Sequence, residues 1–392
     1  MVNSREIKLR YGCNPHQSPA RVYATEGALP LRILNGTPGY INLLDALNSW
    51  QLVDELRAAL GLPAAASFKH VSPSGAAVGV PLTSELKRIY FVEDGDLSPL
   101  ACAYARARGT DRMSSFGDWA ALSEPCDIPT ALLLKREVSD GVIAPGYEEG
   151  ALDILRTKKK GTYAVVEIDP GYVPPDTETR EVFGIRFEQK RNTVKITGDT
   201  LKTIVTEAKE ISPDAARDLI LAQITLKYTQ SNSVCFALGG QVIGVGAGQQ
   251  SRVHCTRLAA SKADKWFLRQ HPLFARLSFR EGIGRAERDN AVDKLLEESL
   301  TPAEKYTWQD DFAEAPDTLS APQRAEWINL FFGVSLASDA FFPFRDNIDR
   351  AQRSGVRYIV QPGGSVRDDL VIEACNEYGM VMAMSGIRLF HH

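Results

Sequence analysis

Cysteine is scarce in this sequence of 392 residues, and the six cysteines that occur lie far apart. No two of them form a C-x-x-C pair, and no cluster of cysteine and histidine has the spacing of a zinc site. These absences argue against a disulfide framework and against a structural zinc ion. We therefore expect buried free thiols at all six positions: Cys13, Cys102, Cys126, Cys235, Cys255 and Cys375.

Long apolar runs and a strong charge imbalance are missing as well. No stretch approaches the roughly 18 consecutive apolar residues of a membrane span, and residues 1–8 contain no apolar segment of a secretory signal. The 45 basic and 49 acidic residues leave a net charge of −4, whereas a dedicated nucleic-acid binder is usually basic. The sequence predicts a soluble, cytoplasmic protein with no membrane and no nucleic acid as partner.

The chain alternates β-branched runs with amphipathic stretches, which is typical of the α/β class. Apolar residues recur at helical spacing over 41–60, and a Gly-Leu-Pro sequence ends that pattern. Residues 64–68 then read as a short buried strand that leads into the polar turn 69–75. We expect a helix to open at the small residues 76–80. The turn would then occupy the usual ligand position of an open α/β sheet, where a strand gives way to a helix.

The same alternation resumes after the Pro-rich segment 169–176, which is the best candidate for a linker. Two apolar runs joined by Gly239-Gly240 predict a β-hairpin. Near the end, residues 356–360 and 380–384 read as buried strands on either side of an amphipathic helix. The sequence therefore predicts two α/β halves.

The pair Lys69-His70 is the sharpest chemical signal in the sequence. Histidine titrates near neutral pH and a neighbouring cation stabilises an oxyanion, so the pair suits a reaction that removes one proton and builds negative charge. The pair also allows a second interpretation, a histidine that is simply hydrogen-bonded beside a strand. The sequence contains no G-x-G-x-x-G fingerprint and no Walker A motif that would favour one of these two interpretations. The run 158–160, three lysines, is interpreted as a solvated loop.

Eight strings, in order along nearly the whole sequence, match one known family. They are RYGCNPHQ at 10–17, FKHVSP at 68–73, RMSSFGD at 112–118, EVSDG at 137–141, KYTQSNS at 227–233, GAGQQSR at 246–252, SDAFFPFRD at 338–346 and RLFHH at 388–392. On these strings the chain resembles the transformylase part of the AICAR transformylase/IMP cyclohydrolase family.

The resemblance implies an α/β fold of two cytidine-deaminase-like α/β/α subdomains without zinc. Residues 1–175 and about 270–330 would form the first subdomain, and residues 176–269 and about 331–392 the second. The resemblance also implies a homodimer with composite active sites. Bifunctional members of the family carry an N-terminal cyclohydrolase domain, which we expect to be absent here. A separate cyclohydrolase would then close the ring to IMP.

The activity that the resemblance implies is a folate-dependent formyl transfer. The co-substrate 10-formyltetrahydrofolate would formylate the 5-amino group of AICAR, giving FAICAR in de novo purine synthesis. His70 is implied as the base that takes a proton from this weakly nucleophilic amine. Lys69 would stabilise the oxyanion and protonate the departing folate nitrogen, and Asn232 would add a further hydrogen bond.

The binding residues are carried over from the same resemblance. Arginines suit the phosphate of the nucleotide, and nucleotide contacts are implied at Arg10, Tyr11, Asn42, Gly117, Asp140, Arg252, Arg388 and Phe390. Phenylalanine rings would flank the pterin and a carboxylate would accept hydrogen bonds from its N–H groups. The folate contacts are implied at Phe116, Phe341, Asp346 and Asn347. No metal-binding side chains are expected, and the family leaves room for a potassium ion held by backbone oxygen atoms.

One alternative stays open because the segment 384–386 departs from the pattern expected just before the final string. A formyltransferase of a specialised nucleoside pathway would act on an analogous amino-carboxamide heterocycle, such as a pyrazole nucleotide. A non-catalytic partner subunit is disfavoured because all three implied catalytic residues are present. A zinc deaminase is disfavoured because the sequence lacks the H-x-E and P-C-x-x-C signature.

Overall fold

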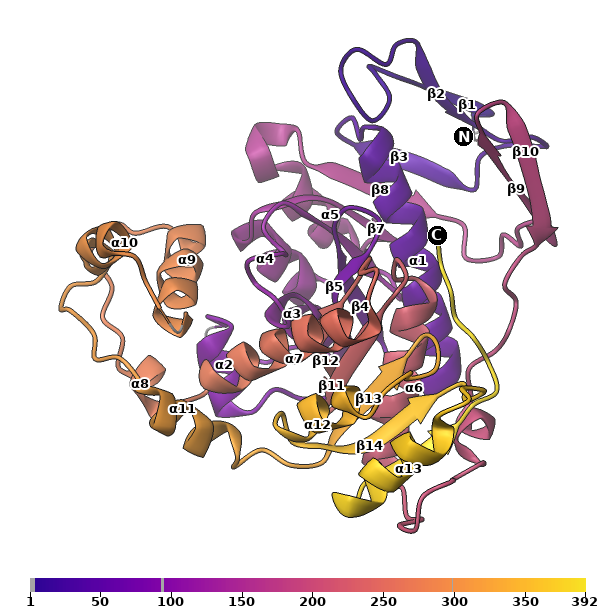
Figure 1. The fold of residues 1–392 in the computed structure, drawn as a ribbon. Helices are drawn as coiled ribbons and strands as arrows, with labels where there is room; N and C mark the ends of the chain where they lie inside the picture. Colours follow the sequence, from indigo (N-terminus) through magenta and orange to yellow (C-terminus); the bar gives the residue numbers. More distant parts are fainter. Residues whose placement is uncertain (1–3, 93–94, 298) are drawn as a thin grey trace.

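The computed structural model describes residues 4–92, 95–297 and 299–392 (Figure 1). The first three residues of the segment examined for a secretory signal lie outside these ranges. In the described part of the chain, eleven strands form one mixed sheet with helices packed on it. From one edge to the other the strands are β15 (Val381–Met384), β14 (Val356–Gln361), β13 (Val334–Ser338), β11 (Val234–Leu238), β12 (Gln241–Gly246), β5 (Pro73–Val78), β4 (Ala64–Phe68), β6 (Asp118–Leu122), β7 (Ser139–Ala144), β8 (Ala164–Ile168) and β3 (Leu31–Asn35).

Helices cover both faces of this sheet, and each face has its own apolar core. One core is built with side chains of α1 and α6, and the other with side chains of α3, α4, α7 and α13. The α/β class predicted from the sequence is therefore confirmed. The longer helices are α1 (Tyr40–Leu60), α3 (Pro99–Gly109), α4 (Ile128–Arg136), α5 (Glu149–Arg156), α6 (Pro213–Lys227), α7 (Arg252–Leu268), α9 (Arg285–Leu296), α11 (Ala321–Ile328), α12 (Asp346–Gln352) and α13 (Asp368–Glu377).

The sheet consists of two halves with the same connectivity. In the first half β4 pairs antiparallel with β5 and β6, and β7 and β8 continue parallel to β6. In the second half β11 pairs antiparallel with β12 and β13, and β14 and β15 continue parallel to β13. A helix precedes each hairpin, α1 in one half and α6 in the other. An antiparallel pairing of β5 with β12 joins the halves into one sheet.

Most elements expected from the sequence are confirmed, with one exception. The helix over 41–60, the strand after it and the Gly-Gly hairpin are present as α1, β4 and β11–β12. The helix expected at 76–80 is wrong, because the chain forms strand β5 there and the turn before it joins two antiparallel strands. The small residues serve close packing instead. A Cβ atom at Gly75 would lie 2.1 Å from the carbonyl oxygen of Ala107 in α3.

Two expectations about side chains are wrong. Cys13 is exposed, because it lies in the loop after β1 (Glu6–Leu9), whereas the other five cysteines are buried as expected. Lys158 is buried rather than solvated. Its Nζ donates to the carbonyl oxygens of Leu134, at 2.6 Å, and Glu137, so it satisfies carbonyl groups at the end of α4. Burial lowers the pKa of Lys158 to about 8.

Two parts lie outside the main sheet. One comprises two small antiparallel ribbons, formed by β1 with β2 (Ala20–Tyr23) and by β9 (Thr177–Val182) with β10 (Ile185–Lys190). The other is the segment 270–330, which has a small apolar core of its own. Within it, α9 is tied to the first half by ion pairs of Asp289 with Arg112 and of Arg285 with Glu137, each at 2.6 Å. Its assignment to the first subdomain remains a prediction.

Candidate active site

The Lys69-His70 pair lies in the tight turn of the β4–β5 hairpin. The backbone N–H of Lys69 donates to the carbonyl oxygen of Ser72 at 3.0 Å, which closes the turn around His70 and Val71. These two residues have φ values of 56° and 58°. A two-residue hairpin turn of type I′ requires such positive φ angles and usually has Asn and Gly there. Left-handed backbone at a valine is unusual and strained, and strained backbone of this kind clusters at functional sites.

Lys69 reaches across to the segment before β6. Its Nζ donates to the carbonyl oxygen of Phe116 at 2.5 Å. Gly117 follows with a φ of +73°, and its N–H donates to the carbonyl oxygen of Val138 at 2.9 Å. This left-handed turn directs the Phe116 carbonyl towards the lysine and leaves the Phe116 ring half-exposed. The implied catalytic lysine is thus held beside two of the implied binding residues.

The antiparallel pairing of β5 with β12 brings loops of the second half of the chain to the strand ends where Lys69 and His70 lie. Because the two strands run in opposite directions, the end of β12 and the start of β11 lie beside the start of β5. The loop before β11 consequently touches the turn of Lys69 and His70, where the N–H of Gln230 donates to Ser72 Oγ at 3.3 Å. Asn232 lies in this loop, so the structure brings the loops of Lys69, His70 and Asn232 together.

Both polar atoms of the Asn232 side chain are engaged. Its Nδ2 donates to the carbonyl oxygen of Gln249 at 2.8 Å, and its Oδ1 accepts from Arg252 Nη2 at 2.7 Å. Arg252 is buried, and its Nη1 donates to Asp339 and to the carbonyl oxygen of Ser233. The Arg252 guanidinium, implied as a nucleotide contact, therefore faces Asn232 and Asp339 in this structure.

The C-terminal residues close this side of the site. The N–H of Leu389 donates to the carbonyl oxygen of Asp339 at 2.9 Å, and the N–H of Ser231 donates to that of His391 at 3.0 Å. Leu389 is buried, whereas Arg388 and Phe390 on either side of it are exposed. The Arg388 guanidinium lies 4.7 Å from the centre of the Phe390 ring. An exposed cation beside an aromatic ring suits a phosphate and a flat heterocycle.

The start of α1 forms another wall. Asn42 Oδ1 accepts from the N–H of Gly39 at 3.0 Å and so caps the helix. One turn further along α1, the buried Asp45 accepts from the N–H of Val71 in the β4–β5 turn at 2.7 Å. Burial raises the pKa of Asp45 to about 6, although hydrogen bonds from the turn and the charge of His70 oppose the rise. Sequence reasoning missed Asp45, whose sole signal is an acidic residue on an apolar helix face.

The implied folate residues lie beyond the end of β13. Phe341 is half-exposed after that strand, and Asp346 is the first residue of α12. Asn347 is buried, with its Oδ1 accepting from Thr256 Oγ1 at 2.8 Å and its Nδ2 donating to Asp346 Oδ1 at 3.0 Å. Its position suggests that it fixes the Asp346 carboxylate rather than facing a ligand.

Of the remaining implied nucleotide contacts, two have no polar link to this group in the part of the chain that the structure describes, and one lies in the strand next to Gly117. Arg10 and Tyr11 are in the loop after β1, with the guanidinium 5.9 Å from the ring centre. Among the described residues, no hydrogen bond or ion pair links either of them to the turn of Lys69 or to Asn232. Asp140, at the start of β7, is exposed and forms an ion pair of 2.7 Å with Lys159.

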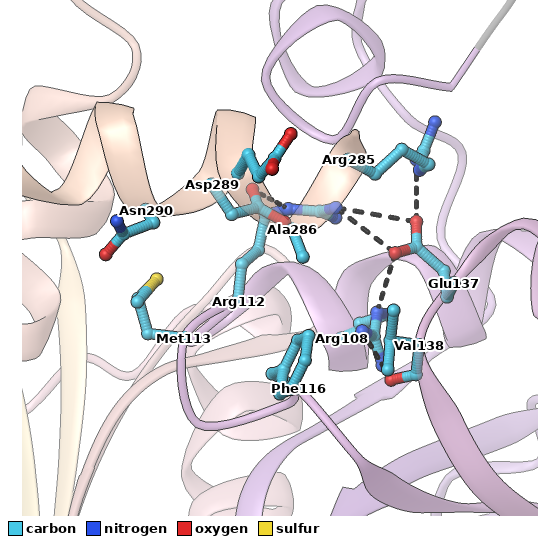
Figure 2. Close-up of a pocket in the computed structure, with 11 residues that line it drawn as sticks. Arg108, Arg112, Met113, Phe116, Glu137, Val138, Arg285, Ala286, Asp289 and Asn290 are labelled. Atoms are coloured by element: carbon cyan, nitrogen blue, oxygen red, sulfur yellow. Dashed lines mark hydrogen bonds and ion pairs between the residues drawn. The ribbon is translucent and has the colours of Figure 1, made fainter. Parts of the chain in front are cut away.

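A cavity of about 310 Å³ adjoins the site on the side of Phe116 and is shown in Figure 2. Its polar wall is an ion network in which Arg108, Arg112 and Arg285 surround Glu137. Burial raises the pKa of Glu137, but Arg112, Arg108 and Arg285 together outweigh burial and lower it to about 2. The sequence did not single out Glu137, although it begins one of the eight strings.

Neither a membrane span nor a metal-binding group of side chains is found in the part of the chain that the structure describes. No helix there is long and apolar enough to cross a membrane. No three His, Cys, Asp or Glu side chains within the same ranges gather closely enough to hold a metal ion.

Comparison with known proteins gives one consistent family. The family model described as "AICARFT/IMPCHase bienzyme" matches residues 1–262. A "Bifunctional purine biosynthesis protein PurH" of Magnetococcus marinus is 31% identical over 391 residues, which is 98% of this chain and 59% of the relative. Proteins of the same name from Xanthomonas campestris pv. campestris and Roseobacter denitrificans are 33% and 32% identical over 100% and 98% of this chain, again 59% of each relative. The chain thus spans about three fifths of the length of these relatives.

Proposed function

Since the chain belongs to the AICARFT/IMPCHase bienzyme family, we propose that it acts in the cytoplasm as a formyltransferase of purine synthesis. It transfers the formyl group of 10-formyltetrahydrofolate to the 5-amino group of AICAR and releases FAICAR. The observation that carries this proposal is the single edge of the sheet at which the loops of Lys69, His70 and Asn232 meet.

The proposed reaction needs one base and one acid at this edge. The amine nitrogen attacks the formyl carbon while His70 accepts its proton, and negative charge develops on the formyl oxygen. Lys69 stabilises that oxyanion, with Asn232 as a further hydrogen-bonding group. The bond from the formyl carbon to the folate N10 then breaks, and N10 takes up a proton from Lys69. Atoms and charge balance without a metal or redox step.

The two substrates are proposed to bind to different residues around these loops. AICAR is placed against Asn42, Gly117 and the tail, where Arg388 and Phe390 are both exposed. Asp140 and Arg252 complete that set, the latter by holding Asn232. The reduced folate is placed between the exposed rings of Phe116 and Phe341, with Asp346, fixed by Asn347, facing the pterin.

A homodimer with composite sites would account for two features of the monomer. Arg10 and Tyr11 lie apart from the rest of the site, so a second copy would supply them. The β9–β10 hairpin exposes every strand residue, and Phe183 at its tip is 99% exposed. An isolated two-stranded hairpin is marginally stable in water, and large exposed apolar groups mark interaction sites. A second copy of this chain is therefore the proposed partner of the hairpin.

A potassium ion fits the chemistry beside Asn232. Potassium takes oxygen ligands, including backbone carbonyl groups. The buried hydroxyl of Ser233 has no hydrogen-bond partner in the described part of the chain and offers one such oxygen. The ion would support the position of the asparagine loop, and we assign it no step in the reaction.

The test is a mass-resolved assay of the purified 392-residue chain with AICAR and 10-formyltetrahydrofolate. We expect FAICAR without IMP, and addition of a separate cyclohydrolase should then yield IMP. The matched control is His70→Ala, which should lower kcat about 100- to 10,000-fold because a positioned general base contributes that much. IMP formed by the chain alone would refute the expected lack of cyclohydrolase activity. A His70→Ala variant with nearly full rate would remove His70 as the base.

The same assay distinguishes the second candidate. Segment 384–386 departs from the expected pattern, and its Ser385 N–H donates to the carbonyl of Gln361 close to the tail that carries Arg388. An amino-carboxamide pyrazole nucleotide would replace AICAR in parallel reactions. Turnover of the pyrazole alone would make the specialised nucleoside pathway the function of this chain. Repeating the reactions in sodium instead of potassium buffer measures any dependence on the ion.

A further inference from the structure

The two halves of the sheet share a device that holds the hairpin turn. In the second half, Asp218 of α6 accepts hydrogen bonds from both N–H groups of the β11–β12 turn. Its Oδ2 accepts from Gly239 and its Oδ1 from Gly240, each at 2.7 Å. The two glycines have φ values of 64° and 79°. A buried carboxylate therefore binds two successive amides of a left-handed turn.

The first half carries the same device at the catalytic turn. Asp45 lies five residues after the first residue of α1, as Asp218 does in α6. It accepts from the N–H of Val71 at 2.7 Å, and the backbone of His70 favours the ionised form of its carboxylate, which opposes the rise in pKa that burial causes. The turn amides and the helix positions correspond, so Asp45 and Asp218 are equivalent in the repeated connectivity.

The halves differ in what occupies the two left-handed positions. Glycine adopts positive φ without steric cost, so the Gly239-Gly240 turn is relaxed. The catalytic turn has His70 and Val71 at φ values of 56° and 58°, where a β-branched residue is a genuine outlier. Such a conformation persists only where its surroundings impose it. Asp45 is the side chain that binds this backbone from the adjacent helix.

We propose that Asp45 is the positioning residue of the catalytic turn, and that its carboxylate holds His70 and Val71 in the left-handed backbone that presents the base to the amine. The proposal rests on the proposed formyltransferase function for its catalytic consequence. Asp45 is buried behind the turn and is assigned no contact with either substrate. The charged groups that act on its carboxylate are His70, which favours its ionised form, and Asp118, which disfavours it.

The chain offers an internal control for a mutational test. Asp45→Asn keeps the size of the side chain but weakens the acceptor, and Asp218→Asn makes the same change at a turn without a catalytic residue. We expect Asp45→Asn to lower kcat about 10- to 100-fold with little change in KM, because misplacement of a catalytic group by about 1 Å costs up to that factor. Asp218→Asn should change kcat by less than about twofold, since its turn carries no reacting group. A folded Asp45→Asn variant with at least half the wild-type kcat would overturn the proposal.

A rescue experiment separates positioning from a general loss of stability. Val71→Gly relieves the strain at one of the two positions, so the double variant Asp45→Asn/Val71→Gly should regain about tenfold of the lost kcat. The same glycine in the Asp218→Asn background should leave kcat unchanged. Equal effects of Val71→Gly in both backgrounds would contradict a specific link between Asp45 and the turn.

A readout without turnover keeps this test independent of the proposed function. The backbone amide signals of His70 and Val71 in NMR spectra, assigned with His70→Ala and Val71→Gly, report the conformation of the turn directly. We expect Asp45→Asn to move both signals and Asp218→Asn to leave them in place, because Asp45 accepts a hydrogen bond from this turn whereas Asp218 accepts from the other. Unchanged amide signals in Asp45→Asn would refute the positioning role. Moved signals in a chain that forms no FAICAR would refute the formyl transfer and leave the positioning role standing.

Discussion

Glu137 connects three arginines at the wall of the cavity beside Phe116. The carboxylate is nearly buried at the end of α4, and its ion pairs with Arg108, Arg112 and Arg285 join α3, the segment after α3 and α9 through one acceptor. Breaking a buried ion network by removing one partner is costly because the remaining charges stay desolvated. At this residue, stability and the shape of the site depend on the same charge.

We predict that Glu137→Gln lowers the free energy of unfolding by about 3–5 kcal/mol at neutral pH. Chemical denaturation measures the change. The matched control is Glu124→Gln, which removes an exposed ion pair with Arg57 and should cost less than about 1 kcal/mol. Equal losses in the two variants would show that the network around Glu137 contributes no more than a surface pair.

The ionisation of Glu137 should also make the free energy of unfolding depend on pH. The pKa of Glu137 falls from an ordinary 4.5 to about 2 in the folded chain. The carboxylate therefore contributes stability above about pH 4.5 that is lost as the pH falls towards 2. Acid titration of the denaturation midpoint should show a weaker fall in Glu137→Gln than in the wild type.

At the scale of single elements, the Gly117 turn holds Phe116, whose carbonyl oxygen accepts from Lys69 and whose ring is proposed to contact the folate. Its φ of +73° is the reason for glycine, since a Cβ there would meet nothing within 4 Å. We predict that Gly117→Ala destabilises the chain by about 1–2 kcal/mol through backbone strain alone, and lowers kcat by displacing the Phe116 carbonyl from Lys69. Gly198→Ala is the control, because Gly198 has open space and no positive φ. Equal melting temperatures for both variants would contradict the role of the turn.

The elements themselves were largely predictable from local patterns. Helical spacing gave α1, and a Gly-Gly pair gave the β11–β12 hairpin, because both signals lie within one element. Strand β5 was missed because its small residues are needed for close packing against α3. That contact is with another element, so residues 76–80 alone do not reveal it. The positive φ angles of His70 and Val71 could not be predicted from the sequence either. The carboxylate that accepts from the Val71 N–H belongs to Asp45, which is 26 residues away in the sequence.

At the scale of the whole molecule, the exposed β9–β10 hairpin predicts the oligomeric state. Phe183 and Ile185 are large apolar side chains that are 99% and 60% exposed. We expect wild-type chain to sediment as a dimer and Phe183→Asp/Ile185→Asp to sediment as a monomer with reduced turnover, because the variant places charge in the interface. Val366→Asp, at an equally exposed valine in another loop, is the control. A dimer that survives the double substitution would exclude the hairpin as its contact.

The arrangement of the site across both halves was only partly predictable. The matching strings identified Lys69, His70 and Asn232 as a set, but the pairing of β5 with β12 that brings their loops together is a long-range contact. The burial of Arg252 against Asp339, and of Asn347 against Thr256, likewise depends on neighbours far along the chain. Motifs therefore predicted which residues to look for, whereas their arrangement and their hydrogen-bond partners depended on the fold.

The turn of Lys69 and His70 joins two strands in the interior of the eleven-stranded sheet, where β12 and β6 flank β5 and β4. The strands that carry this turn cannot move without breaking ladders on both sides. In the proposed reaction, admission of the two substrates would then depend on the surroundings, above all on the tail held by the backbone hydrogen bonds of Leu389 and His391. Opening of that tail, rather than motion of the proposed base, would set the residence time of the product.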